Sequence, residues 1–137
     1  MCDQFPKECT RKTKNSIVQV EENGRKFLIK NKSKKQFCVV KIDGCYPISG
    51  IKCDYLIYYP EKEICMFIEL KGKDLKHAVA QLTATIKALS KSCKSIEAYA
   101  VLSATPKINT ALQNEIRNLR NQGIRFDSKN GEYCRNF

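Results

Sequence analysis

Short apolar runs alternate with polar turns over the first half of the chain. Residues 16–31 hold two such runs around Asn23-Gly24, a dipeptide that accepts the positive φ angles of a type I′ turn. Residues 35–43 form a further apolar run, and residues 53–71 hold two more around the polar sequence PEKE. This pattern predicts a series of antiparallel strands joined by tight turns.

The second half of the chain changes to helical spacing. Apolar residues recur on one face through residues 74–92, and Asp74 precedes them as a helix N-cap. Residues 95–104 predict a strand. A second helix is expected from Thr105-Pro106, with proline at its first position, to Gly123 as its C-terminal stop. Its inner face would carry Ile108, Leu112, Ile116 and Leu119.

A last short strand is expected at residues 124–127, and residues 1–15 are polar and basic enough to predict a solvated N-terminal arm. Strands come first, and helix, strand, helix and strand follow in turn. The sequence therefore predicts one α/β domain over residues 1–137, with a mixed central β-sheet, antiparallel hairpins and two main flanking helices.

The formal net charge of +11 is consistent either with a soluble basic protein or with a partner rich in phosphate. Residues 1–36 hold ten Lys or Arg against four acids, so the excess is largest near the N-terminus. Lys32, Lys34 and Lys35 follow the first hairpin closely. A basic turn of this kind is expected to contact a sugar–phosphate backbone without reading sequence.

The eight cysteines are scattered among apolar strand residues, and the chain has one His and no C-x-x-C motif. Clustered ligands for zinc are therefore absent. The first residues show no apolar run of a signal peptide, and no segment approaches the length of a membrane span. We expect mostly free, buried thiols in a cytoplasmic protein without membrane contact. A metal or redox pair of Cys45 and Cys53 is a minor alternative.

Three charged residues interrupt the apolar strands of residues 53–71. With the turn centred between Glu61 and Lys62, Asp54 stands opposite Glu69, and Lys71 lies two residues beyond Glu69. Opposed residues and residues two apart share a sheet face, so these three side chains are expected to converge at one strand end.

Asp43 is expected to come near Asp54 if the strand before it returns as a neighbour. Carboxylates that are crowded together repel each other unless a cation lies among them. Oxygen ligands suit Mg²⁺ or Mn²⁺, so the corner predicts a divalent cation. The simpler interpretation, a salt bridge between Glu69 and Lys71 on an edge strand, is less consistent with strands that are apolar on both faces.

These residues resemble the PD-(D/E)xK nuclease superfamily, whose members share the restriction-endonuclease-like fold and include archaeal Holliday-junction resolvases. The resemblance lies in Asp54, in Glu-Leu-Lys at 69–71 after an apolar strand, and in the helix that follows. It covers residues 43–86 by motif. The sequence departs from the family in lacking the Pro before Asp54 and in starting with a hairpin where the family often has a helix bearing an acidic residue.

The resemblance implies a metal-dependent endonuclease with DNA as the expected substrate. Metal ligands would be Asp54, Glu69, the carbonyl of Leu70 and, in place of the missing helix acid, Asp43. Lys71 would hold or deprotonate the attacking water, and Gln81 matches a Gln that several branches of the family carry in this helix. Phosphate contacts would come from the basic residues beside the site, Lys73 and Lys76, with His77 as a weaker candidate.

Two alternatives remain open at this point. A non-catalytic nucleic-acid-binding subunit of a larger complex would use the same fold and the same basic residues. A ribonuclease would differ only in its substrate. One domain carries one cleavage site, so that cutting both strands of a duplex would require a homodimer or a partner protein.

The basic turn gives a direct test of nucleic-acid binding. Replacing Lys32, Lys34 and Lys35 together with Ala is expected to weaken binding to every DNA sequence alike, because phosphate contacts carry no sequence information. The slope of binding affinity against salt concentration should also become shallower. A titration of labelled DNA at several salt concentrations measures both quantities, and an unchanged slope would show that this turn faces away from the nucleic acid.

Overall fold

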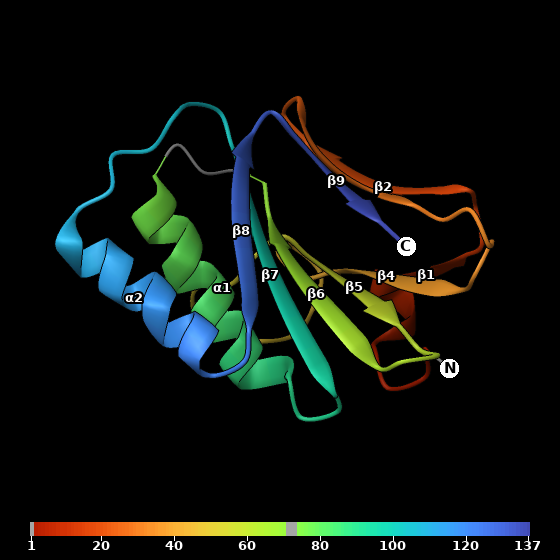
Figure 1. Ribbon diagram of the computed structural model, residues 1–137. Coiled ribbons are helices and arrows are strands. Elements are labelled where there is room, and N and C mark those ends of the chain that lie inside the picture. Colours follow the sequence, from red (N-terminus) through yellow and green to blue (C-terminus); the bar gives the residue numbers. More distant parts are fainter. Residues whose placement is uncertain (1, 71–73) are drawn as a thin grey trace.

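The computed structural model describes residues 2–70 and 74–137. Within these residues the chain forms three layers (Figure 1): two helices, a central six-stranded sheet and a smaller three-stranded sheet. The central sheet is mixed, with antiparallel and parallel neighbours. The predicted α/β class and the mixed sheet are thus confirmed.

The central sheet has the strand order β1-β4-β5-β6-β7-β8. Its strands are β1 (Thr10–Thr13), β4 (Phe37–Lys41), β5 (Tyr55–Tyr59), β6 (Ile64–Glu69), β7 (Ser95–Leu102) and β8 (Arg125–Asn130). Within this sheet β1, β4, β5 and β6 pair antiparallel in that order, while β6, β7 and β8 run parallel. The parallel strands are joined by the helices α1 (Leu75–Leu89) and α2 (Thr110–Asn121), as parallel neighbours require a crossover connection.

The second sheet begins with the predicted hairpin of β2 (Ile17–Glu22) and β3 (Arg25–Lys30). Asn23 and Gly24 both have positive φ, of 49° and 79°, which is the backbone of a type I′ turn. The third strand of this sheet is β9 (Glu132–Asn136), which pairs parallel with β3. The sequence pattern did not predict β9, because its pairing partner lies about a hundred residues earlier in the chain.

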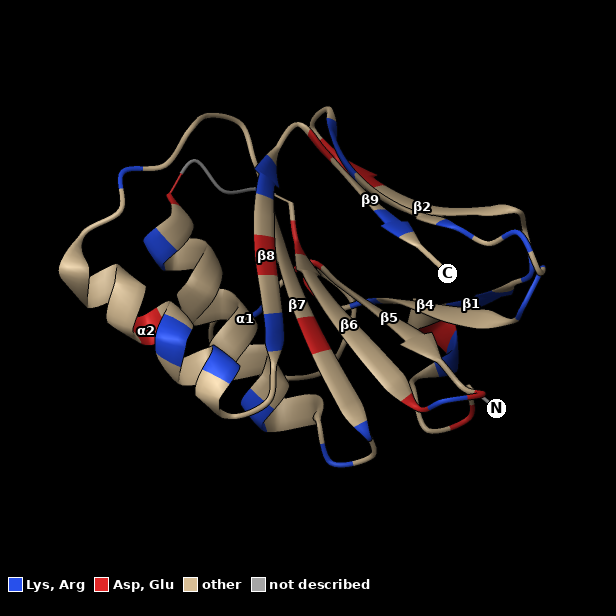
Figure 2. Ribbon diagram, viewed as in Figure 1, with Lys and Arg blue, Asp and Glu red and all other residues tan. Residues whose placement is uncertain are grey.

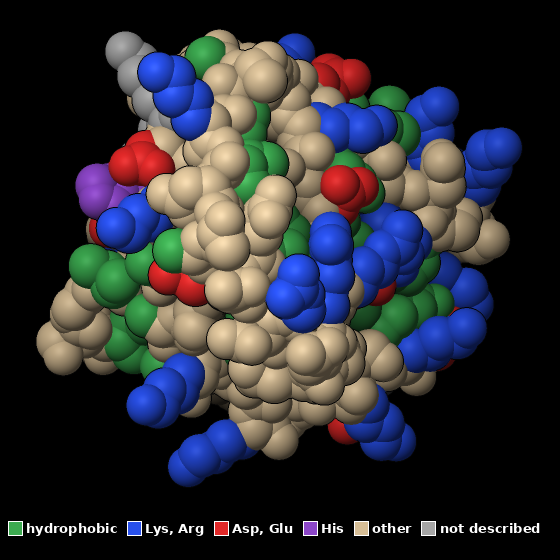
Figure 3. Space-filling model, turned by 60° about the vertical axis from the view of Figure 1, so that its left-hand side comes forward, with side chains coloured by type: hydrophobic (Ala, Val, Ile, Leu, Met, Phe, Trp, Pro, Cys, Tyr) green, Lys and Arg blue, Asp and Glu red, His purple; other side chains and the backbone are tan. Residues whose placement is uncertain are grey.

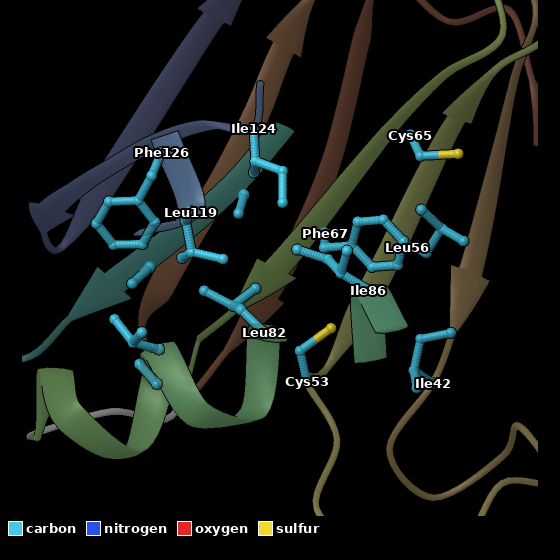
Figure 4. Close-up of a cluster of buried hydrophobic side chains, with 14 of the residues drawn as sticks. Ile42, Cys53, Leu56, Cys65, Phe67, Leu82, Ile86, Leu119, Ile124 and Phe126 are labelled. Atoms are coloured by element: carbon cyan, nitrogen blue, oxygen red, sulfur yellow. The ribbon is translucent and has the colours of Figure 1, made fainter. Parts of the chain in front are cut away.

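Two cores lie on the two faces of the central sheet. Leu56, Phe67 and the inward face of α1 fill the core on the helix side, as Figure 4 shows. Ile57 and Met66 point to the opposite face and pack against the second sheet. β5 and β6 are therefore covered on both sides, which explains why their sequences are continuous apolar runs.

A polar and aromatic network fixes the second sheet on the central one. Arg135 of β9 donates to both carboxylate oxygens of Glu97 in β7, at 2.8 and 2.7 Å, and the Tyr99 hydroxyl donates to the same carboxylate. Burial favours a raised pKa for Glu97, but the hydrogen bonds from Arg135 and Tyr99 outweigh it and hold the pKa below its usual value. Tyr133 donates to Asp127 at 2.8 Å and stacks on Phe27.

Two predicted features of the chain differ from the structure. The predicted solvated arm at residues 1–15 is wrong for the described residues 2–15: β1 is an edge strand of the central sheet, a short 3-10 helix η1 (Lys7–Cys9) precedes it, and Cys2 and Phe5 are buried. The second helix starts at Thr110 rather than at Thr105-Pro106, because the Asn109 side chain accepts the Leu112 backbone N–H as its N-cap.

The inner face of α2 is buried at Leu112, Ile116 and Leu119, as predicted, but Ile108 precedes the helix and is exposed. Gly123 follows the helix with a φ of 83°, which is the left-handed conformation typical of a residue just past a helix end. The predicted end of this helix is thus confirmed, while its predicted beginning is wrong.

The expectation of mostly free thiols is wrong for six of the eight cysteines. The disulfides are Cys2–Cys38, Cys9–Cys45 and Cys65–Cys93, and the free thiols are Cys53 and Cys134. Cys45 is therefore bonded to Cys9 and does not pair with Cys53. The scattered positions in the sequence gave no sign of these bonds, because each partner is brought close by strand pairing or loop packing.

No helix in the described part of the chain is long and apolar enough to cross a membrane. The cytoplasmic location stays a prediction, and its argument from free thiols no longer holds.

Removing one disulfide should lower the stability measurably. Replacing Cys65 and Cys93 together with Ser is expected to lower the free energy of unfolding by about 3–4 kcal/mol, because the bond closes a loop that is otherwise free in the unfolded chain. Urea unfolding measures the change, and Cys134→Ser, at a free and half-buried thiol, is the control. Thiol titration of denatured, unreduced protein should find two thiols; recovery of all eight would contradict the three bonds.

Candidate functional site

The register of β5 and β6 brings Asp54 and Glu69 together. Tyr59 pairs with Ile64 and Tyr55 with Ile68, across the four-residue loop 60–63. Continuing this register by one residue places Asp54 opposite Glu69. The predicted pairing of the hairpin is confirmed, and so is the placement of these two carboxylates beside each other.

Both carboxylates lie on the helix side of the sheet and are almost fully buried. Asp54 is 2% exposed and Glu69 is 1% exposed. The Oδ2 atom of Asp54 accepts the backbone N–H of Leu70 at 2.7 Å. This bond fixes the end of β6, directly after Glu69, against the beginning of β5.

Helix α1 covers the two carboxylates, and two of its polar side chains contact Glu69 and the residue before Asp54. In the orientation that satisfies its amide, Gln81 donates to Glu69 Oε2 at 3.2 Å and to the His77 carbonyl at 3.1 Å. One turn later, the Thr85 hydroxyl accepts the backbone N–H of Cys53 at 2.8 Å. The predicted association of Gln81 with this site is therefore seen in the structure, while Thr85 was not expected from the sequence.

The free thiol of Cys53 lies beside the carboxylates. Burial, together with the nearby charges of Glu69 and Asp54, raises its pKa to about 12, although the hydrogen bond with Thr85 acts in the opposite direction. Without a bound metal ion, a thiol with so raised a pKa is protonated near neutral pH and is a weak nucleophile there.

Arg25 is a further residue that the sequence did not reveal. It is the first residue of β3, in the second sheet, and its Nε donates to the carbonyl of Leu70. Both backbone groups of Leu70 are therefore held, the N–H by Asp54 and the carbonyl by Arg25. Only the packing of the two sheets brings Arg25 to this strand end, so no local pattern could have identified it.

Asp43 lies near the carboxylates but does not stand beside them in the sheet. Ile42 takes the position opposite Asp54, and its N–H donates to the Asp54 carbonyl at 2.9 Å. Asp43 instead lines a groove of about 360 Å³ between α1 and the loop before β5, together with Lys52 and Gln81. The predicted corner of three adjacent carboxylates is thus replaced by a pair with a third acid in the neighbouring groove.

The predicted basic residues are divided between two places. Lys76 is exposed in the first turn of α1, whose N-cap Asp74 accepts the Lys76 N–H at 2.9 Å. The two remaining lysines assigned to the site, Lys71 and Lys73, lie outside the described residues.

The turn with Lys32, Lys34 and Lys35 lies at the opposite end of the sheet (Figure 2). Lys35 forms an ion pair of 3.0 Å with Glu61, in the loop between β5 and β6. A strand of five residues, about 17 Å long, separates that loop from the carboxylates. Contacts made by this turn would therefore lie along a nucleic acid that extends well beyond the candidate site.

The donor atoms at this strand end suit a hard divalent cation in chemical type. They are the carboxylate oxygens of Asp54 and Glu69. The third predicted ligand, the Leu70 carbonyl, accepts the Arg25 Nε–H in this structure instead. Two buried carboxylates side by side are stabilised by a cation between them. Among the residues that the structure describes, no group of three or more His, Cys, Asp and Glu is arranged to hold a metal ion.

Comparison of the chain with family models, with curated proteins and with solved structures finds no match.

Thr85 should be needed to hold the strand that carries Asp54. Thr85→Val keeps the shape of the side chain but leaves the buried Cys53 N–H without its acceptor, so we expect the free energy of unfolding to fall by about 1–3 kcal/mol. Thr83→Val is the matched control, because that hydroxyl bonds only within α1, to the Val79 carbonyl. Urea unfolding measures the free energy of unfolding of both variants. Equal losses would show that the Thr85–Cys53 hydrogen bond stabilises the fold no more than a bond within the helix.

Proposed function

We propose that the protein is a metal-dependent phosphodiester hydrolase of the PD-(D/E)xK type that cleaves DNA. The observation that carries this proposal is the pairing of Asp54 with Glu69 on one face, at the end of two strands that are otherwise apolar. Burying two adjacent carboxylates is unfavourable for stability alone. Their placement is explained if the site binds a cation in order to act on phosphate.

The arrangement of elements supports assignment to the restriction-endonuclease-like fold. β4, β5 and β6 form an antiparallel meander, α1 follows the Glu-Leu-Lys sequence, and β7 then pairs parallel with β6. This order matches what the motif implies for that fold. The disulfide-bonded N-terminal segment and the second sheet would be additions to it.

In the proposed reaction the ion would be held by Asp54 and Glu69, and it would supply a water of lowered pKa as the nucleophile. The Leu70 carbonyl would become a further ligand only once Arg25 released it. Asp54 holds the Leu70 N–H and so fixes the strand end. The Gln81 amide orients Glu69 through Oε2. Lys71 would act in one of two forms: as a neutral amine it would accept the proton of the attacking water, and as an ammonium it would stabilise the charge that develops on the phosphate.

The basic surface supports nucleic acid as the partner. The chain carries 25 Lys or Arg against 14 Asp or Glu. Figure 3 shows these basic side chains distributed around the visible face rather than gathered in one patch. The net charge of +11 supports backbone contacts of low sequence specificity. A homodimer or a partner protein would supply the second site that double-strand cleavage requires.

Substitutions at the paired carboxylates and at the lysine test the enzyme directly. Asp54→Asn, Glu69→Gln and Lys71→Ala should each lower the cleavage rate by about a hundredfold or more, because each removes a charge that the transition state needs. The two carboxylate variants should also weaken Mn²⁺ binding, whereas Lys71→Ala should retain most of it. Cleavage of linear, branched and single-stranded DNA and of RNA, with Mn²⁺ or EDTA, measures the rates, and calorimetry measures metal binding.

Glu115→Gln and Lys91→Ala, at exposed positions away from the site, are the matched controls and should cleave like the wild type. Wild-type protein that cleaves no substrate with any metal would favour the non-catalytic binding subunit. Cleavage of RNA alone would overturn the assignment of DNA as substrate. Unchanged cleavage by Glu69→Gln would place the activity elsewhere.

A further inference from the structure

A groove of about 360 Å³ adjoins the paired carboxylates. It lies between α1 and the loop that precedes β5, and its polar part is formed by Asp43, Lys52 and Gln81. Gln81 connects the two places, since its amide also reaches Glu69 Oε2 at 3.2 Å. Any molecule that occupies this groove and contacts Gln81 would therefore touch a residue that is hydrogen-bonded to Glu69 of the candidate site.

The two walls of the groove differ in chemistry from its polar part. On the loop side lies Ile51, which is 60% exposed and is the most exposed large hydrophobic side chain in the described residues. On the helix side lies His77, whose side chain is 80% exposed. An aliphatic wall and a flat imidazole wall together provide what a nucleobase needs on its two faces, as in sites that take a base out of its stack.

The polar groups suit the edge of a base. The Asp43 carboxylate accepts hydrogen bonds. The Lys52 ammonium donates to the Ile48 carbonyl at 2.8 Å and has two further N–H donors. The Gln81 amide uses its N–H groups on Glu69 and His77, so it offers its oxygen as an acceptor. The volume is at the lower end of the range for ligand pockets, so it accommodates one nucleotide and not a stacked base pair. An exposed Ile at the mouth can also insert between bases and unstack them.

We propose that this groove binds one unpaired nucleotide of the DNA strand to be cleaved, stacked between Ile51 and His77, so that single-stranded or locally unpaired DNA is the substrate class. The proposal rests on the proposed function, because it names the substrate of that same site. It assigns the loop before β5 and the first turns of α1 to substrate recognition. The basic turn at residues 32–35, at the far end of the sheet, would contact the backbone of the same strand or its complement.

Binding measured without cleavage tests the groove separately from the chemistry. The probe is a fluorescein-labelled DNA strand of about twelve nucleotides, alone or as a blunt duplex, titrated in EDTA and followed by anisotropy. We expect the wild type to bind the single strand about tenfold more tightly than the duplex. Ile51→Asn should weaken single-strand binding by about tenfold and leave duplex binding nearly unchanged, because it removes the apolar wall without adding charge.

Ile108→Asn is the matched control, since Ile108 is 50% exposed and lies before α2, away from the groove. It should bind both probes like the wild type. His77→Ala should weaken single-strand binding about as much as Ile51→Asn, whereas His77→Phe should restore it, because phenylalanine keeps a flat stacking surface. Restoration by Phe distinguishes stacking from a charge or hydrogen-bonding role of the imidazole.

The outcomes separate this inference from the proposed function. A wild type that cleaves DNA with Mn²⁺ while Ile51→Asn binds and cleaves single strands equally well would overturn the groove and leave the nuclease in place. A wild type that cleaves nothing but shows the expected preference and losses would support the groove as a single-strand site and overturn the nuclease. Equal or tighter binding of the duplex by the wild type would overturn the inference outright.

Discussion

The register between β5 and β6 is the constraint on which the candidate site depends. The loop between them has an even number of residues, so Asp54 and Glu69 fall opposite each other and on the same face. A slip of one residue in either strand would turn one carboxylate into the core between the two sheets, which is formed by residues such as Ile57 and Met66. The apolar residues on both faces of this hairpin therefore fix the position of the charged ones.

The strand end that carries Glu69 is held from all three layers of the molecule. Gln81 of α1 lies over Glu69, Asp54 of the central sheet holds the Leu70 N–H, and Arg25 of the second sheet holds the Leu70 carbonyl. Arg25 can do so only while the second sheet is docked. Docking depends on the Arg135–Glu97 pair and on the contacts of Tyr99 in the central sheet with the rings of Phe27 and Tyr133. A contact far from the site thus contributes to its geometry.

The disulfides cross-link segments that are distant in the sequence. Cys2–Cys38 and Cys9–Cys45 fasten the N-terminal segment to the rest of the fold, and Cys65–Cys93 joins the start of β6 to the connection before β7. Such bonds act mainly by limiting the unfolded chain. At the site itself the cysteine, Cys53, is free and has a raised pKa, so the cross-links and the proposed chemistry are separate.

Local signals in the sequence determined much of the secondary structure of this protein and part of its candidate site. The Asn23-Gly24 turn, the N-cap Asp74 and the two apolar runs around the polar turn of residues 53–71 each act within a few positions. The structure confirms the hairpins, the first helix and the approach of Asp54 to Glu69. One local signal failed: Pro106 can start a helix, but the Asn109 side chain caps α2 later. The rest was decided by tertiary structure. The pairing of β9 with β3, the disulfides and the contact of Arg25 with Leu70 join residues that are distant in the chain. Their formation depends on how whole layers pack, and that packing leaves no periodic trace in the sequence.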